Sequence, residues 1–324
     1  MIPQAISKTK VMNVELRTVD IFALAYIILL SLLEVLFRSN ISGWQNLLFE
    51  NGFILIGLVV LVSVLQRIQS STVRSTSRIT LYMMLTSIIY HQMGTIIHLV
   101  FPFWWDGEIN TVEKALFHGY PTVLLQWTAR PWLTEFMMFG YVVYVALLPA
   151  VAFFIWIRGN QHELEQYLTE FVLTNLLCYL FYFLVPVAGP SRALAAMYTT
   201  PLHGHFFTSV TEYMAANVHL PGGAFPSAHC ASTIVMLAAL YRCSRPVGYG
   251  FVAMAFLIFA STVYGRFHYI TDVIGGISLA ILSLWMIPKL QAILDRLNFR
   301  LEYLVTPRVR PDVIGDGRMP EEAL

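Results

Sequence analysis

The chain has 324 residues, of which 57% are hydrophobic and only 12% are charged, and its formal net charge is +1. Soluble domains carry roughly a quarter charged residues, so this composition excludes a globular surface covered by polar groups. The small net charge argues against nucleic-acid binding, which requires a strongly basic patch. The composition instead predicts a protein whose outer surface faces hydrocarbon.

Eight apolar segments predict membrane-spanning helices, because a bilayer crossing needs about 20 mostly apolar residues. Their ranges are 19–37, 52–66, 79–101, 133–157, 166–187, 229–241, 247–264 and 270–288. The second is short, so we expect it to be tilted or extended by its neighbours, and the sixth is expected to begin near Pro226. The sequence therefore predicts an all-α integral membrane protein, a polytopic helical bundle of about eight spans. The polar tail from Pro307 to Leu324 is expected to be disordered.

Basic residues predict the orientation of these spans, since cytoplasmic loops carry an excess of lysine and arginine. With a cytoplasmic N-terminus, five of the 20 basic residues lie outside and the remaining 15 lie on the cytoplasmic side. The five are Arg38, Lys114, Arg130, Arg192 and Arg266. An even number of spans returns the C-terminus to the cytoplasm. Segments 102–132 and 188–228 are then expected on the outer face.

The first outer segment, 102–132, is rich in tryptophan, a residue typical of the lipid headgroup region. Within it, four apolar residues of 109–118 are spaced to share one face of a helix. They are Ile109, Val112, Leu116 and Phe117. The pattern predicts either a helix lying along the membrane interface or a lid helix packed on the spans.

The stretch GGAFPSAHCAST, residues 222–233, lies where the chain enters the sixth predicted span. Pro226 restricts φ, and Ser227 is a favoured N-cap residue. The first turn of a helix has free N–H groups and a partial positive charge, so it binds anions readily. His229 lies in that turn. Taken alone, Ser227 is explained as a simple cap and His229 as an interfacial histidine.

A second polar stretch, YGRFHYITDVIGG at residues 264–276, precedes the last predicted span. His268 and Asp272 are four residues apart, so they share one helical face if the span begins here. A carboxylate at that spacing holds an imidazole in one tautomer and stabilises its positive charge. An isolated pair of this kind is common. Both stretches together, at the same membrane face, predict a catalytic site there, because ionisable groups near the membrane tend to mark function.

The sequence FPSAH at 225–229, followed by HYITDVIGG at 268–276, resembles the second and third signature motifs of the type 2 phosphatidic acid phosphatase superfamily. Within it the chain looks most like the inositol phosphorylceramide synthase branch. That branch has stretches similar to two of this chain, GAFPSAH at 223–229 and the segment from Ser261 to Gly276. The resemblance covers about 100 to 270, the last six predicted spans. It implies three parts. They are an N-terminal tail with two added helices at 1–78, a six-helix catalytic core at 79–290 and a cytoplasmic tail at 291–324.

The resemblance implies a role for each residue of the two stretches. His268 would attack phosphorus to form a phosphohistidine, with Asp272 orienting it. His229 would protonate the departing alcohol oxygen and then activate the acceptor. Ser227 and nearby backbone N–H groups would hold the phosphoryl oxygens. No metal or other cofactor is implied, and the three cysteines lack metal-ligand spacing.

Two departures from the superfamily pattern leave the cations that face the phosphate open. The first motif, a lysine with Arg-Pro seven residues later, is absent, and Thr262 stands where phosphatase members usually carry an arginine. Arg192, just after the fifth predicted span, and Arg266, two residues before His268, are the candidate phosphate-binding cations. The alternative role of Arg192 is a contact with lipid headgroups.

These observations predict a membrane enzyme that acts on lipid phosphoesters, with lipid and bilayer as its partners. The motifs leave open whether the acceptor is water or a lipid hydroxyl, and the missing arginine and the closer match favour headgroup transfer. A transporter or channel is a different class, typically with charged residues or helix breaks near mid-bilayer. Here the critical groups cluster at one end. A third possibility is a protein of the same fold that binds oxyanions without turnover.

Overall fold

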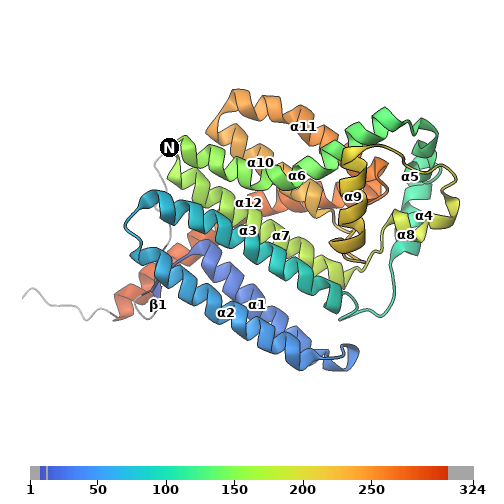
Figure 1. Cartoon of the computed structure of the whole chain (residues 1–324). Coiled ribbons are helices and arrows are strands. Elements are labelled where there is room, and N and C mark those ends of the chain that lie inside the picture. Colours follow the sequence, from blue (N-terminus) through green and yellow to red (C-terminus); the bar gives the residue numbers. More distant parts are fainter. Residues whose placement is uncertain (1–7, 12–13, 306–324) are drawn as a thin grey trace, which may run out of the picture.

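The computed structural model describes residues 8–11 and 14–305, and the polar tail from Pro307 lies outside them (Figure 1). A short antiparallel hairpin of β1 (Lys8–Val11) and β2 (Val14–Arg17) precedes the first helix. The other named elements of the described chain are helices. The predicted all-α class is confirmed, and the hairpin is an addition that the hydropathy pattern did not indicate.

Six helices are long and apolar enough to cross a membrane, so the chain is an integral multi-pass membrane protein. They are α1 (Thr18–Leu36), α2 (Trp44–Arg67), α6 (Pro131–Ile157), α7 (Gln161–Leu184), α11 (Arg245–Tyr264) and α12 (Ile270–Val305). α2 contains the short predicted segment 52–66 and extends it in both directions. α12 continues beyond the predicted end of its span near 288.

The remaining two predicted spans are also helices, but they differ from the six. α3 (Ser71–Ile96) has 26 residues and is rich in hydroxyl side chains, and it is not among the six apolar helices. α10 (Ala228–Cys243) is apolar but has only 16 residues, about 24 Å of helix at 1.5 Å per residue. The hydrocarbon core of a bilayer is about 30 Å thick. The predicted eight helical segments are therefore present, and six meet the criteria for a full span.

α7 is the central helix of the bundle. It packs against α1, α3, α6, α10 and α12, and its side chains are the most buried of the six spans. α1 packs against both α2 and α7, and α2 also contacts α3, so both helices of the N-terminal pair join the rest of the bundle. One continuous hydrophobic core runs from Val19 in α1 to Ala280 in α12.

Polar contacts fix α10 against α7, which matters because α10 carries His229 at its start. In the last turn of α10, Arg242 forms ion pairs with Glu163 at 2.8 Å and with Glu170 at 2.6 Å. In the second turn of α10, the side-chain amide of Asn175 donates to the hydroxyl of Ser232 at 2.9 Å. These contacts hold α10 in one rotation about its axis.

Four short helices gather at one end of the bundle (Figure 1). They are α4 (Asp106–Phe117), α5 (Pro121–Leu124), α8 (Pro190–Ala193) and α9 (Phe206–Asn217), joined by 3-10 turns at Leu125–Thr128 and Ala195–Met197. A further 3-10 turn, Arg38–Asn40, follows α1. α4 packs on α12, α5 on α11 and α9 on α6. The starts of α10 and α12, where both polar stretches lie, are at this end.

α4 confirms the helix predicted at 109–118, although it begins at Asp106. Its inward face is polar, since Asp106 and Glu113 are buried. Val112 and Leu116 of the predicted apolar face are exposed. Ile109 of the same face packs against the buried cluster that contains Tyr269, and α4 packs on α12, so the interfacial helix and the lid helix both stay predictions.

Candidate active site

Ser227 caps the start of α10, as its residue type predicts. Its hydroxyl accepts a hydrogen bond from the backbone N–H of Cys230 at 3.4 Å. Its own N–H donates to the carbonyl of Asp272 at 3.0 Å, and the residue is fully buried. Ser227 therefore joins the first stretch to the second, and its contact with a phosphoryl oxygen stays a prediction.

His268 lies two residues before α12, so it does not share a helical face with Asp272 as the spacing predicted. Its Nδ1 is 2.8 Å from the carbonyl oxygen of Ala224 and 3.5 Å from Oδ2 of Asp272. That carboxylate oxygen accepts the N–H of Tyr269 at 2.8 Å and thereby caps the start of α12. Since a carbonyl can only accept, Nδ1 carries the hydrogen and Nε2 is left as the basic nitrogen.

Backbone contacts join the loops that surround His268. Val187 and Gly223 form an isolated β-bridge, and the N–H of Ala224 donates to the carbonyl of Val187 at 3.3 Å. The N–H of Ser191 donates to the carbonyl of Arg266 at 2.9 Å. The segment after α7 therefore lies between the two polar stretches and fixes the carbonyl that holds His268.

Two glycines of the second stretch let α12 touch the start of α10. A Cβ added at Gly276 would collide with the carbonyl group of Ser227, and one at Gly275 would lie 2.7 Å from the ring of Phe225. Each is closer than real Cβ contacts allow. The pair Gly275–Gly276 is thus explained by close packing, which brings the two histidine-bearing segments together.

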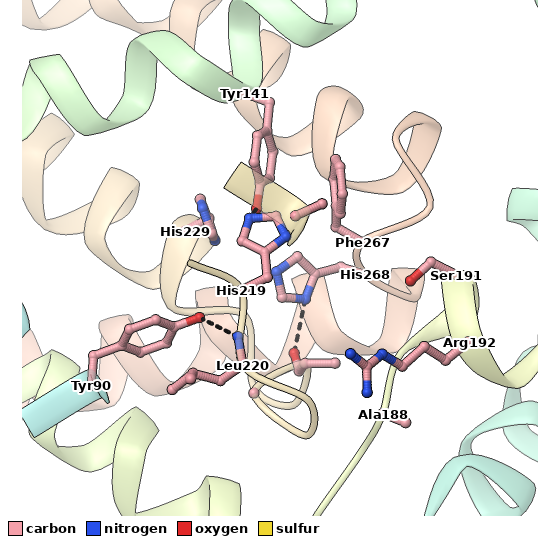
Figure 2. A pocket seen from close by; sticks show the side chains of 13 residues that line it. Tyr90, Tyr141, Ala188, Ser191, Arg192, His219, Leu220, His229, Phe267 and His268 are labelled. Carbon is pink, nitrogen blue, oxygen red and sulfur yellow. Dashed lines mark hydrogen bonds between the residues drawn. The ribbon is translucent and has the colours of Figure 1, made fainter. Parts of the chain in front are cut away.

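A cavity of about 220 Å³ lies among these loops (Figure 2). It is lined by Tyr90, Tyr141, Ala188, Ser191, Arg192, Ala215, His219, Leu220, Gly223, Ala224, His229, Phe267 and His268. The ring centres of His229 and His268 are 5.6 Å apart. The structure thus brings both predicted catalytic histidines to one cavity, and Asp272 lies behind His268.

The two candidate cations have different surroundings. Arg192, in α8, lines the cavity with Ala188 and Ser191. The guanidinium of Arg266 lies over the ring of Tyr198 at 4.0 Å from its centre and donates to the carbonyl of Thr200 at 2.5 Å. Within the described residues, the cavity wall includes Arg192 but not Arg266. Of the two candidates, Arg192 is therefore the one placed at the cavity, and its contact with a phosphate stays a prediction.

A third histidine lies at this cavity, although the sequence offered no partner for it. His219 lines the wall, and its Nε2 is 2.8 Å from the hydroxyl of Tyr141. The Tyr141 ring also stacks on His229 at 4.8 Å and on Phe267 at 4.3 Å. Burial lowers the pKa of His219 to about 4, and the nearby His268 adds to this effect. The sequence did not indicate a role for Tyr141, because it lies within an apolar span, α6.

α4 supplies two buried carboxylates that position the loops, and the sequence pointed to neither. Glu113 accepts the N–H and the hydroxyl of Thr271 at 2.8 and 2.9 Å. Asp106 accepts the N–H groups of Ala188 at 2.7 Å and Gly189 at 3.0 Å. Burial raises the pKa of Asp106, and the hydrogen bonds that it accepts oppose that rise. For Asp106 the sequence showed only an acidic residue in the first turn of a helix. Such residues usually face solvent, so this position did not indicate a buried role.

Thr262, which stands where phosphatase members of the superfamily usually carry an arginine, is buried and does not line the cavity. Its hydroxyl donates to the carbonyl of Phe259 at 2.8 Å, and its carbonyl accepts the N–H of His268 at 3.1 Å. In the part of the chain that the structure describes, no cluster of three or more His, Cys, Asp or Glu side chains is arranged to hold a metal ion.

The chain matches one protein-family model, described as the PAP2 superfamily, over residues 107–286. No curated protein and no solved structure matches it. The matched region runs from α4 into α12 and includes both polar stretches, and it supports a lipid phosphatase-type function. Because the match spans more than half of its 324 residues, this chain belongs to the PAP2 superfamily.

Proposed function

We propose that the chain is a membrane lipid phosphatase or phosphotransferase that works through a phosphohistidine on His268. The observation that carries this proposal is the 2.8 Å contact between Nδ1 of His268 and the carbonyl of Ala224. It leaves Nε2 as the nucleophilic nitrogen of a ring that lines a cavity. His229 and Arg192 line the same cavity.

In the first proposed step, Nε2 of His268 attacks phosphorus and the P–O bond to the alcohol breaks. His229 gives its proton to the departing oxygen, which spares that oxygen a full negative charge. Arg192 attracts the phosphoryl oxygens, and Asp272 stabilises the positive charge that develops on His268. In the second step an acceptor oxygen attacks, the N–P bond breaks, and its electron pair returns to Nε2.

Hydrolysis and headgroup transfer differ only in the acceptor, and we favour transfer. The resemblance to the inositol phosphorylceramide synthase branch supports it, as does the buried Thr262 in place of the usual arginine. The alternative is hydrolysis of a lipid phosphate with water as acceptor. α4 lies beside His268 through Glu113 and Thr271, which supports lateral access of the lipid beneath 102–132.

The proposed division of the chain follows the resemblance. The six-helix catalytic core would occupy 79–290, with the added helices of 1–78 before it and the cytoplasmic tail of 291–324 after it. The start of the family match within α4 supports the addition of α1 and α2. α3 also lies before the match, yet Tyr90 of α3 lines the cavity, which supports its place in the core.

We also propose that the site faces away from the cytoplasm and that both termini are cytoplasmic. The distribution of basic residues supports this orientation, since α10 begins at the site and ends at Arg242. An impermeant thiol reagent tests it at Ser209→Cys, an exposed position of α9, with Cys243→Ser to remove the half-buried native thiol. Labelling is expected on intact cells, and labelling only after lysis contradicts the orientation.

The activity is tested with purified protein in detergent micelles and a panel of lipid phosphates. Free phosphate reports hydrolysis, and a new phospholipid formed with an added lipid alcohol reports transfer. His268→Ala is the matched inactive control. If the wild-type protein releases no phosphate and forms no new phospholipid on the whole panel, the enzyme proposal fails in favour of oxyanion binding without turnover.

A further inference from the structure

We propose that Tyr90 of α3 binds the substrate by donating a hydrogen bond to an oxygen of the lipid alcohol, close to the P–O bond that breaks. This inference rests on the proposed phosphohistidine mechanism and deepens it. It names a substrate class, a lipid phosphate whose alcohol carries a further oxygen acceptor near the phosphate, such as an ester carbonyl or a hydroxyl. α3 lies before the region that matches the family model, so neither polar stretch indicates this residue.

The hydroxyl of Tyr90 has a hydrogen available for a ligand. Its oxygen accepts the N–H of Leu220 at 3.5 Å. A tyrosine hydroxyl can donate one hydrogen while it accepts another, so this contact leaves the O–H unused. Within the part of the chain that the structure describes, no acceptor contacts that hydrogen. Because the half-buried side chain lines the cavity, its O–H can be donated to an oxygen bound there.

The position of Tyr90 is fixed by packing on two sides. Its ring lies against that of Tyr179 in α7, with ring centres 5.8 Å apart. One turn further along α3, a Cβ added at Gly94 would lie 2.8 Å from a methyl carbon of Leu220, which is closer than real Cβ contacts allow. α3 and the loop that leads to α10 are therefore in direct contact. A hydroxyl held in this way is oriented before the substrate binds.

Tyr90 lies on the side of the cavity where the proposed mechanism places the alcohol. In an in-line displacement the leaving oxygen is on the far side of phosphorus from Nε2 of His268. His229 is proposed to protonate that oxygen, so the departing alcohol and the acceptor occupy this side in turn. Figure 2 shows His229 and Tyr90 on one side of His268 and Arg192 on the other. The contact with Tyr90 would therefore serve both steps.

The surroundings of this hydroxyl make it selective. Ala215 and Leu220, which line the cavity with Tyr90, add apolar surface on this side. A lipid that lacks the oxygen acceptor would cover the hydroxyl without pairing it. An unpaired polar group that loses its water costs more than a paired one gains, so such a lipid is disfavoured.

The test compares wild type and Tyr90→Phe on two substrates. Dioctanoyl phosphatidic acid has ester carbonyls close to the phosphate, whereas hexadecyl phosphate releases a similar alcohol that has no further oxygen. Phenylalanine keeps the ring contact with Tyr179 and removes only the hydroxyl. Loss of one neutral hydrogen bond should lower kcat/KM for the phosphatidic acid by about 3- to 10-fold, mainly through KM. The value for hexadecyl phosphate should not change. Tyr213→Phe, at an exposed tyrosine of α9, is the matched control and should equal the wild type on both substrates.

Two results would overturn the inference. Equal losses on both substrates would mean that Tyr90 contacts the phosphoryl group or only supports the fold, and a lowered melting temperature would identify the second case. Wild-type kinetics on both substrates would mean that the hydroxyl binds neither. Failure of the proposed function is distinguishable, because the wild-type protein would then turn over neither substrate.

Discussion

Asp106, the first residue of α4, accepts a hydrogen bond from the hydroxyl of Tyr269 at 3.1 Å, across 163 residues of sequence. The same carboxylate accepts the N–H groups of Ala188 and Gly189. One buried side chain therefore joins the loop that leads to Arg192 with the residue that follows His268. The relative position of Arg192 and His268, the proposed phosphate-binding cation and nucleophile, depends on this contact.

Asp106→Asn tests that dependence. The amide has one oxygen in place of two, so it cannot accept all three hydrogen bonds, and in either orientation its NH₂ group would face a backbone N–H donor. Hydrogen bonds to charged groups contribute about 1.5–3 kcal/mol each, so we expect a lower melting temperature and a higher KM for the lipid phosphate. Glu108→Gln, an exposed position of the same helix, is the control. Wild-type stability in Asp106→Asn would show that this link is dispensable.

His229→Ala should slow a poor leaving group much more than a good one. An alcohol of high pKa needs a proton as it departs, whereas p-nitrophenolate leaves without one. General acid catalysis contributes about 10²–10⁴ in rate, so the difference between the two substrates is measurable by steady-state kinetics. Equal losses on both substrates contradict the acid role.

His268→Ala should abolish turnover with both substrates and leave no trappable phosphoenzyme.

Asp272→Asn should retain the fold and lower the rate. Its side-chain oxygen still accepts the N–H of Tyr269, so the start of α12 remains capped. Where a carboxylate is essential to the tautomer of a catalytic histidine, its replacement costs about 10⁴ in rate. Because the carbonyl of Ala224 also holds Nδ1 of His268, we expect a smaller loss. A loss of the full size, measured as kcat, would mean that Asp272 alone orients the ring.

Arg192→Gln and Arg266→Gln should have unequal effects on substrate binding. Arg192 lines the cavity, whereas the guanidinium of Arg266 is occupied by Tyr198 and Thr200. Loss of a charge-assisted contact of about 1.5–3 kcal/mol lowers kcat/KM by about 10- to 100-fold, and we expect this for Arg192→Gln. Arg266→Gln should mainly lower the melting temperature. The reverse order, measured with inorganic phosphate as inhibitor, would reassign the cation.

Stability should fall as the pH falls from about 6.5 to about 4, with a contribution from His219. Its folded-state pKa is about 4, below the ordinary value near 6.5, so the unfolded chain takes up this proton first. The loss of stability due to His219 is complete below about pH 4 and absent above about pH 6.5. Melting temperatures of the wild type and His219→Gln across this range measure it, and the wild type should show the steeper fall. Parallel curves would mean that His219 does not titrate differently on folding.

The sequence by itself determined the class of protein and the two polar stretches. Apolar segments of sufficient length can avoid unpaired backbone groups in hydrocarbon only as helices or closed barrels, and their length favours helices. Hydropathy therefore predicted all eight helical segments, and local rules predicted Ser227 as the cap of α10. Both are properties of consecutive residues.

The partner of His268 could not be predicted from its spacing to Asp272. The i to i+4 rule holds inside a helix, and His268 lies before α12 begins. Its nearest acceptor is the backbone carbonyl of Ala224. Every residue type has such a carbonyl, so the sequence does not indicate which one accepts this hydrogen bond. Carbonyl contacts of this kind depend on which loops meet.

Only the tertiary structure decided which other side chains reach the cavity. Tyr141 and His219 line the cavity and Asp106 holds the loop beside it, yet the three residues lie in separate segments of the chain. Their residue types also occur commonly in purely structural roles. The sequence offered both Arg192 and Arg266 as candidate cations. In the structure, the guanidinium of Arg266 contacts the ring of Tyr198 and the carbonyl of Thr200. The physical reason is that hydropathy and capping act between neighbours along the chain, whereas the cavity is formed by contacts between segments that are distant in sequence, from Tyr90 to His268.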